Sequence, residues 1–225
     1  MKNLIRYCCF LFCCLLPTLV FSQKDNIVDK HVELICKDLQ EYKVEGKILD
    51  FKEFYQASII KYKLTESISS YVYIRLQKNC KDFAELSYRS QVDRKSDWEL
   101  HKSIPEAEIT KIEAKAFFTH DTLYYLESTN DLVLVDLRNG MWIEHFVDES
   151  TSHLTFKKTG KTKFQIKYVK SNNSIRKKMS LVGDKYYYEI LKKFDDYYWV
   201  CTVDPKRKLY YTFKLYLKNP KLLKI

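Results

Sequence analysis

The stretch KFQIKYV, Lys163–Val169, places Phe, Ile and Tyr at alternate positions with Lys and Gln between them. Alternation with a period of two is typical of a strand that has one buried face and one wet face. Polar turns flank the stretch, Lys158 to Lys161 before it and Ser171 to Ser174 after it. The stretch therefore predicts one strand of an antiparallel hairpin.

The same pattern of short apolar runs and polar turns extends outward to Phe117 on one side and to Leu217 on the other. Runs rich in Tyr, Phe, Val and Ile that alternate with short turns are typical of antiparallel hairpins. The Asn139-Gly140 pair is the strongest turn signal, because both residues tolerate the positive φ of a type I′ turn. The strands expected from this pattern are 123–128, 132–136, 141–147, 153–156, 163–169, 175–181, 185–193, 197–203 and 209–217.

The N-terminal part has helical periodicity instead. Apolar residues at spacings of three and four run from Val28 to Tyr42 and predict a first amphipathic helix. Asp50, with Glu53 three residues later, is typical of the start of a second helix, which is expected to end near residue 63. Ser67 or Ser69 is expected to start a third helix, whose apolar face comprises Val72, Leu76, Cys80 and Phe83.

Together these patterns predict an α+β fold, in which an N-terminal helical segment and its connection (24–104) pack on an antiparallel β-meander (105–225) of about eight or nine strands. The connection, Ser90–Ile104, is polar, and its Trp98 is expected to pack as a plug against a neighbouring element. The meander is expected to curve into a barrel or a strongly bent sheet. Strand number and stagger decide between the two, and the sequence shows neither.

Residues 1–23 are typical of a secretory signal peptide, with Lys2 and Arg6 before an apolar core and cleavage expected near Gln23. An uncleaved membrane anchor is the alternative, but the apolar run is short for a span and contains Pro17. A lipoprotein signal would require a cysteine at the cleavage junction, and Cys8, Cys9, Cys13 and Cys14 lie too deep in the apolar core for that. The expected product is exported, periplasmic or extracellular, and has no transmembrane span.

The chain is basic. Its formal net charge is +10, and it falls to +8 without residues 1–23. A basic protein outside the cytoplasm meets anionic lipid head groups, acidic glycans or acidic proteins more readily than nucleic acid. We therefore expect an envelope protein or an anionic surface as the partner, and no nucleic acid. Because the lysines are interleaved with the strand pattern, an ordinary solvated face is the alternative.

Three cysteines lie beyond residue 23, namely Cys36, Cys80 and Cys201. In an oxidising compartment Cys36 and Cys80 are expected to form a disulfide, because both lie on or beside the apolar stripe of a predicted helix. Cys201 is then expected to remain a free thiol.

The sequence contains no His-Glu-x-x-His, nucleophile-elbow, P-loop or dinucleotide-binding motif. His145 and His153 fall on adjacent predicted strands, but two histidines are an incomplete ligand set for structural zinc. No metal site, cofactor or catalytic residue is therefore assigned.

Aromatic residues cluster in three successive predicted strands, at 186–188, 197–199 and 210–211. One core face cannot readily absorb rings from both faces of these strands, so one set is expected to line a surface or a cavity. Cross-strand aromatic ladders over an ordinary core are the alternative. The pattern predicts a non-enzymatic binding module that contacts an envelope protein; a lipocalin-like carrier of a small apolar ligand and a hydrolase with an unrecognised site are the alternatives. The binding residues assigned on this basis are Tyr187, Tyr198 and Trp199, with Lys185, Lys192 and Lys193 at the rim.

The segment from Cys36 to Cys80, with the run Leu76–Phe83, and the stretches Ser171–Arg176 and Gly183–Tyr186 resemble secreted bacterial proteins of one architecture. In these proteins a helical segment with a spaced pair of cysteines precedes a small antiparallel β domain. The resemblance would cover much of the chain beyond residue 23. It implies an architecture and carries no activity.

Overall fold

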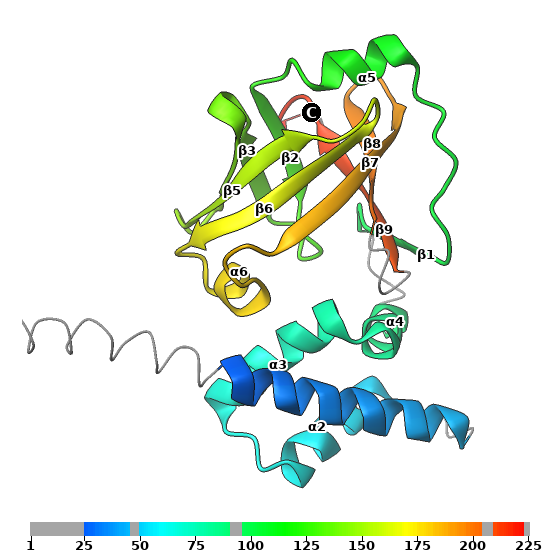
Figure 1. Ribbon diagram of the computed structural model, residues 1–225, viewed down its shortest axis with the longest axis vertical. Coiled ribbons are helices and arrows are strands. Elements are labelled where there is room, and N and C mark those ends of the chain that lie inside the picture. The colour runs from blue at the N-terminus through cyan, green and yellow to red at the C-terminus, as the bar shows by residue number, and fades with distance from the viewer. Residues whose placement is uncertain (1–24, 46–49, 91–95, 204–208, 223–225) are drawn as a thin grey trace, which may run out of the picture. The chain divides into compact units, whose positions relative to one another are not determined.

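Figure 1 shows the computed structural model, which describes residues 25–45, 50–90, 96–203 and 209–222. The chain divides into a helical unit that ends at Ser90 and a barrel unit that begins at Gln91. The predicted α+β class is confirmed. The sheet begins before residue 105, because a strand inside the expected connection belongs to it. The expected signal peptide, 1–23, lies outside the described residues.

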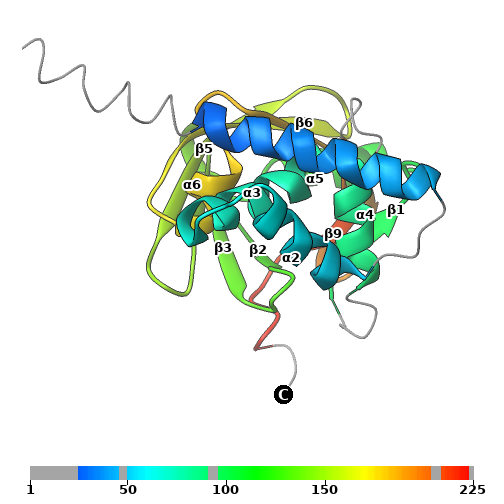
Figure 2. The same cartoon turned by 90° about the horizontal axis from the view of Figure 1, so that it is seen from below.

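The described part of the helical unit contains a helix at 25–44 and three shorter ones, α2 (Phe51–Lys61), α3 (Glu66–Asn79) and α4 (Lys81–Arg89). Figure 2 shows the helix at 25–44 running along α2 to α4. Asp50 caps α2 as predicted, because its carboxylate accepts from the backbone N–H groups of Lys52 and Glu53 at 2.8 and 3.0 Å. The apolar stripe of the first helix is buried, as its spacing predicts, through Val28, Val32, Ile35 and Leu39.

The Cys36–Cys80 disulfide is present, with 5.7 Å between the two Cα atoms, and confirms the predicted pairing. Cys80 also separates α3 from α4, because its backbone is extended, with φ −113° and ψ 108°. The prediction of one continuous third helix is therefore wrong at Cys80. Phe83, beyond the break, still packs in one core with Val72 and Leu76.

Strands β2 to β9 of the barrel unit form a closed antiparallel ring of eight strands. Consecutive strands are hydrogen-bonded, and the ring closes where Tyr124 of β2 pairs with Tyr216 of β9. The sheet is therefore a barrel (Figure 1), which answers the question that the sequence left open. Its strands are β2 (Thr122–Leu126), β3 (Leu132–Asp136), β4 (Met141–His145), β5 (Thr151–Lys158), β6 (Lys163–Ser171), β7 (Lys185–Lys193), β8 (Tyr197–Thr202) and β9 (Tyr210–Tyr216).

A further short strand, β1 (Glu99–His101), pairs with the start of β9 and lengthens the closing seam. Trp98 precedes it and stacks on Phe213 with 4.3 Å between ring centroids, while its Nε1 donates to the Leu126 carbonyl at 2.6 Å. The prediction that Trp98 packs as a plug is confirmed. The prediction of a plain connection is wrong at β1, since three residues are too few to show an alternation.

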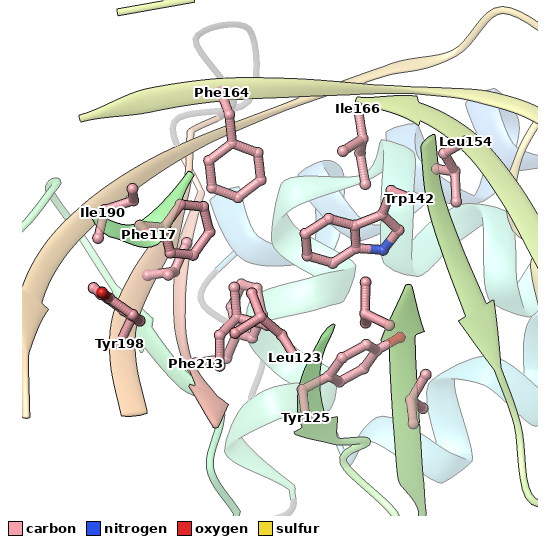
Figure 3. Packing of buried hydrophobic residues seen from close by; sticks show 14 of the residues in the cluster. Phe117, Leu123, Tyr125, Trp142, Leu154, Phe164, Ile166, Ile190, Tyr198 and Phe213 are labelled. Carbon is pink, nitrogen blue, oxygen red and sulfur yellow. The ribbon is translucent and has the colours of Figure 1, made fainter. Parts of the chain in front are cut away.

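Aromatic side chains fill the interior of the barrel, where they point toward one another (Figure 3). Phe164 stacks on Tyr188 and on Trp142, with 4.9 and 5.9 Å between ring centroids. Phe117 lies against both Phe164 and Tyr198, at 5.4 and 5.1 Å. Of the aromatic strands from which one set of rings was expected to line a surface or a cavity, Tyr198 belongs to this core, and Tyr186 and Tyr188 pack against it.

Two short helices lie at opposite ends of the barrel, α5 (Lys111–Phe117) and α6 (Ser174–Met179) (Figure 1). Helix α5 was not expected from the sequence, although its start carries a capping box between Thr110 and Glu113. The prediction of a strand at 175–181 is wrong. The side chain of Asn173 accepts from the backbone N–H groups of residues 175 and 176 and starts a helix there instead.

Cys201 is fully buried, and burial first, then the charge of Glu189, raises its pKa to about 12. A thiol that is both inaccessible and protonated reacts slowly. On the chain from residue 24 onward we expect a thiol reagent at pH 8 to find no reactive thiol in the native protein and one after unfolding in denaturant. Three thiols after unfolding, without reductant, would contradict both the disulfide and the single free cysteine.

Candidate binding surface

The structure separates the three aromatic residues that the sequence assigned to binding. Tyr198 is 1% exposed and lies inside the barrel, so its assignment to the surface is wrong. The reason is the pleat, because Tyr198 and Val200 of β8 share the inward face with Ile190 of β7. Tyr187 is 41% exposed and is the assigned aromatic residue that presents its ring to solvent.

Trp199 also points outward, but it does not join Tyr187. Its ring packs edge-on against His101, with 6.1 Å between centroids, and it is half-buried. The Tyr187 carbonyl accepts from the N–H of Val203, which directly follows β8 and lies four residues beyond Trp199. Tyr187 and Trp199 therefore lie about 13 Å apart along the strand direction. One aromatic patch containing both is therefore not formed.

Two of the three assigned lysines are held by their own neighbours. Lys192 forms an ion pair with Glu108. Lys193 donates to the backbone carbonyls of Phe194 and Asp195. Lys185 is exposed and lies on the outer face of β7 beside Tyr187. Of the six assigned binding residues, Tyr187 and Lys185 thus come together on an open surface.

That surface continues across β6 and β5. Phe164, Ile166 and Tyr168 are buried, so the alternate residues of β6 point away from the core. Lys167 lies directly opposite Lys185, and Gln165 lies directly opposite Tyr187. We call the outer face of β5, β6 and β7 the basic side of the barrel; its outward cations include Lys157, Lys163, Lys167, Lys170 and Lys185.

The charge of the chain is concentrated in this part of the sequence. Residues 151–193, from β5 through β7, contain 12 Lys and Arg but only two acidic residues, Asp184 and Glu189. Residues 121–149, from β2 through the turn after β4, contain seven acidic residues and one cation, Arg138. Four of these seven are exposed, namely Asp121, Asp131, Asp148 and Glu149, so the barrel has a basic side and an acidic side.

Like charges face each other on the basic side without compensation. Side chains directly opposite in an antiparallel pair have Cβ atoms about 5 Å apart, and like charges there are destabilising. Lys167 and Lys185 occupy such a pair, and neither forms an ion pair with a carboxylate in the part of the chain that the structure describes. Burial first, then the charges of Lys170 and His145, lower the pKa of His153 on the same side. The local potential is therefore positive.

A second polar cluster lies at the α6 end of the barrel, inside it. Arg176 of α6 reaches inward, where its Nε donates to Glu144 at 3.0 Å and its Nη2 donates to the Tyr125 hydroxyl at 2.7 Å and to Glu127. The Tyr125 hydroxyl in turn donates to Glu144 at 2.8 Å. Glu144 is 6% exposed. Each member of this cluster is thus hydrogen-bonded to another member.

This arrangement is suited to holding α6 on the barrel rather than to catalysis. The buried carboxylate of Glu144 faces a guanidinium, and burial raises the pKa of Tyr125 well above its ordinary value, so the hydroxyl stays a hydrogen-bond donor. In the described residues, no group of three or more His, Cys, Asp or Glu side chains lies close enough together to hold a metal ion. Nor does any described helix combine the length and the apolar character needed to cross a bilayer.

Lys167 and Lys170 were not assigned to the surface from the sequence, and the inward position of Arg176 was not expected. Lys167 was visible in the alternation of 163–169, but its meeting with Lys185 depends on which strand lies beside β6. Lys170 has the parity of the inward residues, and it points outward because the register between β5 and β6 shifts at His153. The sequence matches no protein-family model, and no curated protein or solved structure shows significant similarity to it.

Proposed function

We propose that the chain is an exported, non-enzymatic binding module that holds an anionic partner against the basic side of its barrel. The observation that carries the proposal is the uncompensated pair Lys167 and Lys185 beside the exposed ring of Tyr187. An anion placed over this pair would relieve the repulsion between the two ammonium groups, and the ring would add apolar contact area. The proposal keeps the predicted envelope protein or anionic surface as the class of partner.

The filled interior counts against the alternative of a small-ligand carrier. A carrier barrel needs an apolar space between its walls. Here the rings of Phe164, Trp142 and Phe117 stack across the space where such a ligand would lie. The cluster around Arg176 likewise gives little support to a hydrolase, because its carboxylates are already bonded to the guanidinium.

Export is supported by the disulfide. Disulfides persist in oxidising compartments and are rare where thiols are kept reduced. The Cys36–Cys80 bond therefore supports the secretory signal expected at residues 1–23 and, with it, a partner in the cell envelope or outside the cell.

Retention on a polyglutamate resin at low salt tests the proposal. We expect the wild-type chain to bind and to elute with rising salt, because exposed charges are screened within about 10 Å at 0.1 M. Lys167→Gln with Lys185→Gln should weaken the binding about tenfold, since exposed ion pairs contribute up to about 1 kcal/mol each. Tyr187→Ala should also weaken it while leaving the melting temperature nearly unchanged.

The matched control is Lys111→Gln with Lys115→Gln on α5, which removes the same charge from two exposed lysines at the other end of the barrel. Equal weakening by both double variants would show that net charge alone drives retention. A wild-type chain that passes through the resin at low salt, and that also ignores anionic vesicles, would refute the proposal.

A further inference from the structure

An exposed apolar turn lies at the edge of the basic side. The chain leaves α6 and enters β7 through residues 180–184, which we call the 180–184 turn. Its second and third residues are Leu181 and Val182, and Val182 is 79% exposed. Single exposed apolar residues are common on protein surfaces, so exposure alone indicates nothing. Whether this turn is suited to binding depends on its backbone contacts and on the charges around it.

The turn is held rigidly by the barrel. The Gly183 backbone N–H donates to the Tyr168 carbonyl, and the Tyr168 N–H donates to the Asp184 carbonyl, both at 2.9 Å. Gly183 has φ +94°, a conformation that L side chains rarely adopt. The Asp184 carboxylate accepts from the Leu181 N–H at 2.7 Å. These bonds fix the backbone on both sides of Val182, so the apolar side chains are presented from a fixed frame.

Cations surround the turn on the barrel surface. Lys185 follows it directly, and Lys167 lies opposite Lys185. Lys170 lies two residues beyond Tyr168, to which the turn is hydrogen-bonded, and Lys177 is exposed on α6. The acidic residues of this region are both engaged, Asp184 with the Leu181 N–H and Glu189 with Lys163 at 3.6 Å.

We propose that this end of the basic side docks on an anionic lipid bilayer, with Leu181 and Val182 entering the head-group region and the surrounding lysines lying over the lipid phosphates. The inference rests on the proposed function and names its partner. A projecting apolar group in a collar of lysines is the arrangement that adds apolar burial to electrostatic attraction at a membrane surface. A soluble acidic protein would gain little from Val182.

The kind of cation also favours lipid over a shaped protein partner. Every outward cation on the basic side is a lysine, and the arginine of this region, Arg176, points into the barrel. Lysine acts as a point charge that attracts phosphate without a fixed geometry, whereas arginine is the usual choice for bidentate recognition of carboxylates. The phosphate groups of a fluid bilayer offer negative charge in no fixed arrangement, which suits lysine better than arginine.

The acidic side of the barrel would orient the docked protein on the bilayer. Four exposed acidic residues lie in 121–149, namely Asp121, Asp131, Asp148 and Glu149, and they would be repelled by the same lipid surface that attracts the lysines. Among these strands and turns, the exposed apolar residue Val147 is followed directly by Asp148 and Glu149. Val147 therefore serves as a matched control for Val182, because its exposure is similar and its neighbouring charges are opposite.

Sedimentation with vesicles tests the inference. We expect the chain from residue 24 onward to bind vesicles of phosphatidylcholine with about one third phosphatidylglycerol at low salt, and not vesicles of phosphatidylcholine alone. With about 1 kcal/mol for each lysine near the surface, Lys167→Gln with Lys185→Gln should lower the partition coefficient roughly 30-fold. Val182→Ser should lower it about tenfold, since burial of such a side chain is worth about 1.5 kcal/mol or more.

The controls are Lys111→Gln with Lys115→Gln and Val147→Ser, which should each stay within about twofold of the wild type. Insertion has its own readout, a polarity-sensitive dye on Val182→Cys, which can be labelled selectively because Cys201 is buried. Its emission should shift to the blue on anionic vesicles, while the same dye on Val147→Cys should not respond. No shift at residue 182 in vesicle-bound protein would overturn insertion of the turn.

Failure of this inference differs from failure of the proposed function. Lysine-dependent retention on polyglutamate without binding to anionic vesicles would identify a soluble acidic partner and refute the bilayer. Salt-sensitive self-association of the chain, with the basic side of one copy on the acidic side of another and no vesicle binding, would refute it as well. Absence of both retention and vesicle binding would refute the proposed function too.

Discussion

Replacing Arg176 by Ala is expected to lower the free energy of unfolding of the barrel unit by about 3–5 kcal/mol, because it leaves the buried carboxylate of Glu144 without its cation. Urea unfolding followed by tryptophan fluorescence measures this loss. The three tryptophans, Trp98, Trp142 and Trp199, all lie in the barrel unit. Trp142 also contacts Glu144, with 3.4 Å between Nε1 and the carboxylate.

The neighbouring residue on α6 provides the control. Lys177 is exposed, and Lys177→Ala should change the free energy of unfolding by no more than about 0.5 kcal/mol. Glu144→Gln introduced together with Arg176→Ala should recover part of the loss, because a neutral amide costs less to bury than an unpaired carboxylate. If Arg176→Ala were as mild as Lys177→Ala, the guanidinium would not hold α6 on the barrel.

The strands were the most predictable part of the fold. The alternation at 163–169 and the boundaries 132–136 and 185–193 are recovered in β3, β6 and β7, because one buried face imposes a period of two on the sequence. Asn139 and Gly140 have the positive φ values predicted for them, 57° and 69°. Such features are local, so the sequence carries them directly.

The wrong prediction at 175–181 arose where two local signals compete. Ile175 to Leu181 alternates weakly and follows a polar turn, which favours a strand. The Asn173 side chain caps the backbone at the same place, and Arg176 gains three acceptors inside the barrel when the segment is helical. Those acceptors come from β2, β4 and the residue after β2, so no local pattern reveals them.

At the candidate surface too, local features were predictable from the sequence and contacts between strands were not. The exposure of Tyr187 and Lys185 follows from alternation along β7, and both were assigned from the sequence. The burial of Tyr198 was not foreseen, since the run 197–199 is aromatic throughout and the sequence does not say which ring faces the axis of a closed barrel. The pairing of Lys167 with Lys185 depends on the register between β6 and β7. The sequence does not reveal this register, because the connection between the two strands contains a helix that was not predicted, α6.

The charge asymmetry connects the fold to the proposed function. Chain order places the basic residues 151–193 and the acidic residues 121–149 on successive strands, so the basic and acidic sides are neighbouring parts of the barrel wall that meet at the β4–β5 pair. A mixed distribution with the same net charge would be attracted to an anionic surface in any orientation. Separation of the charges favours one orientation of the barrel, in which the basic side and the 180–184 turn face the anionic surface.

Removing the disulfide is expected to destabilise the helical unit by about 4 kcal/mol. The Cys36–Cys80 bond spans a sequence separation of 44, and closing a loop of that length reduces the entropy of the unfolded chain by about this amount at 25 °C. A unit of this size rarely has much more stability to lose, so Cys36→Ser with Cys80→Ser should leave the helices largely unfolded at 37 °C. Circular dichroism at 222 nm reports this loss, because the long helices lie in this unit.

Tryptophan fluorescence then separates the two units in the same samples. The helical unit contains no tryptophan, so the fluorescence transition of the double serine variant should stay at the wild-type denaturant concentration while the signal at 222 nm falls. Cys201→Ser is the reciprocal control, because a hydroxyl at that buried site should shift the fluorescence transition and spare the helical signal. An unchanged helical signal in the double serine variant would mean that residues 36–80 stay ordered without the disulfide. The expected destabilisation of about 4 kcal/mol would then be wrong.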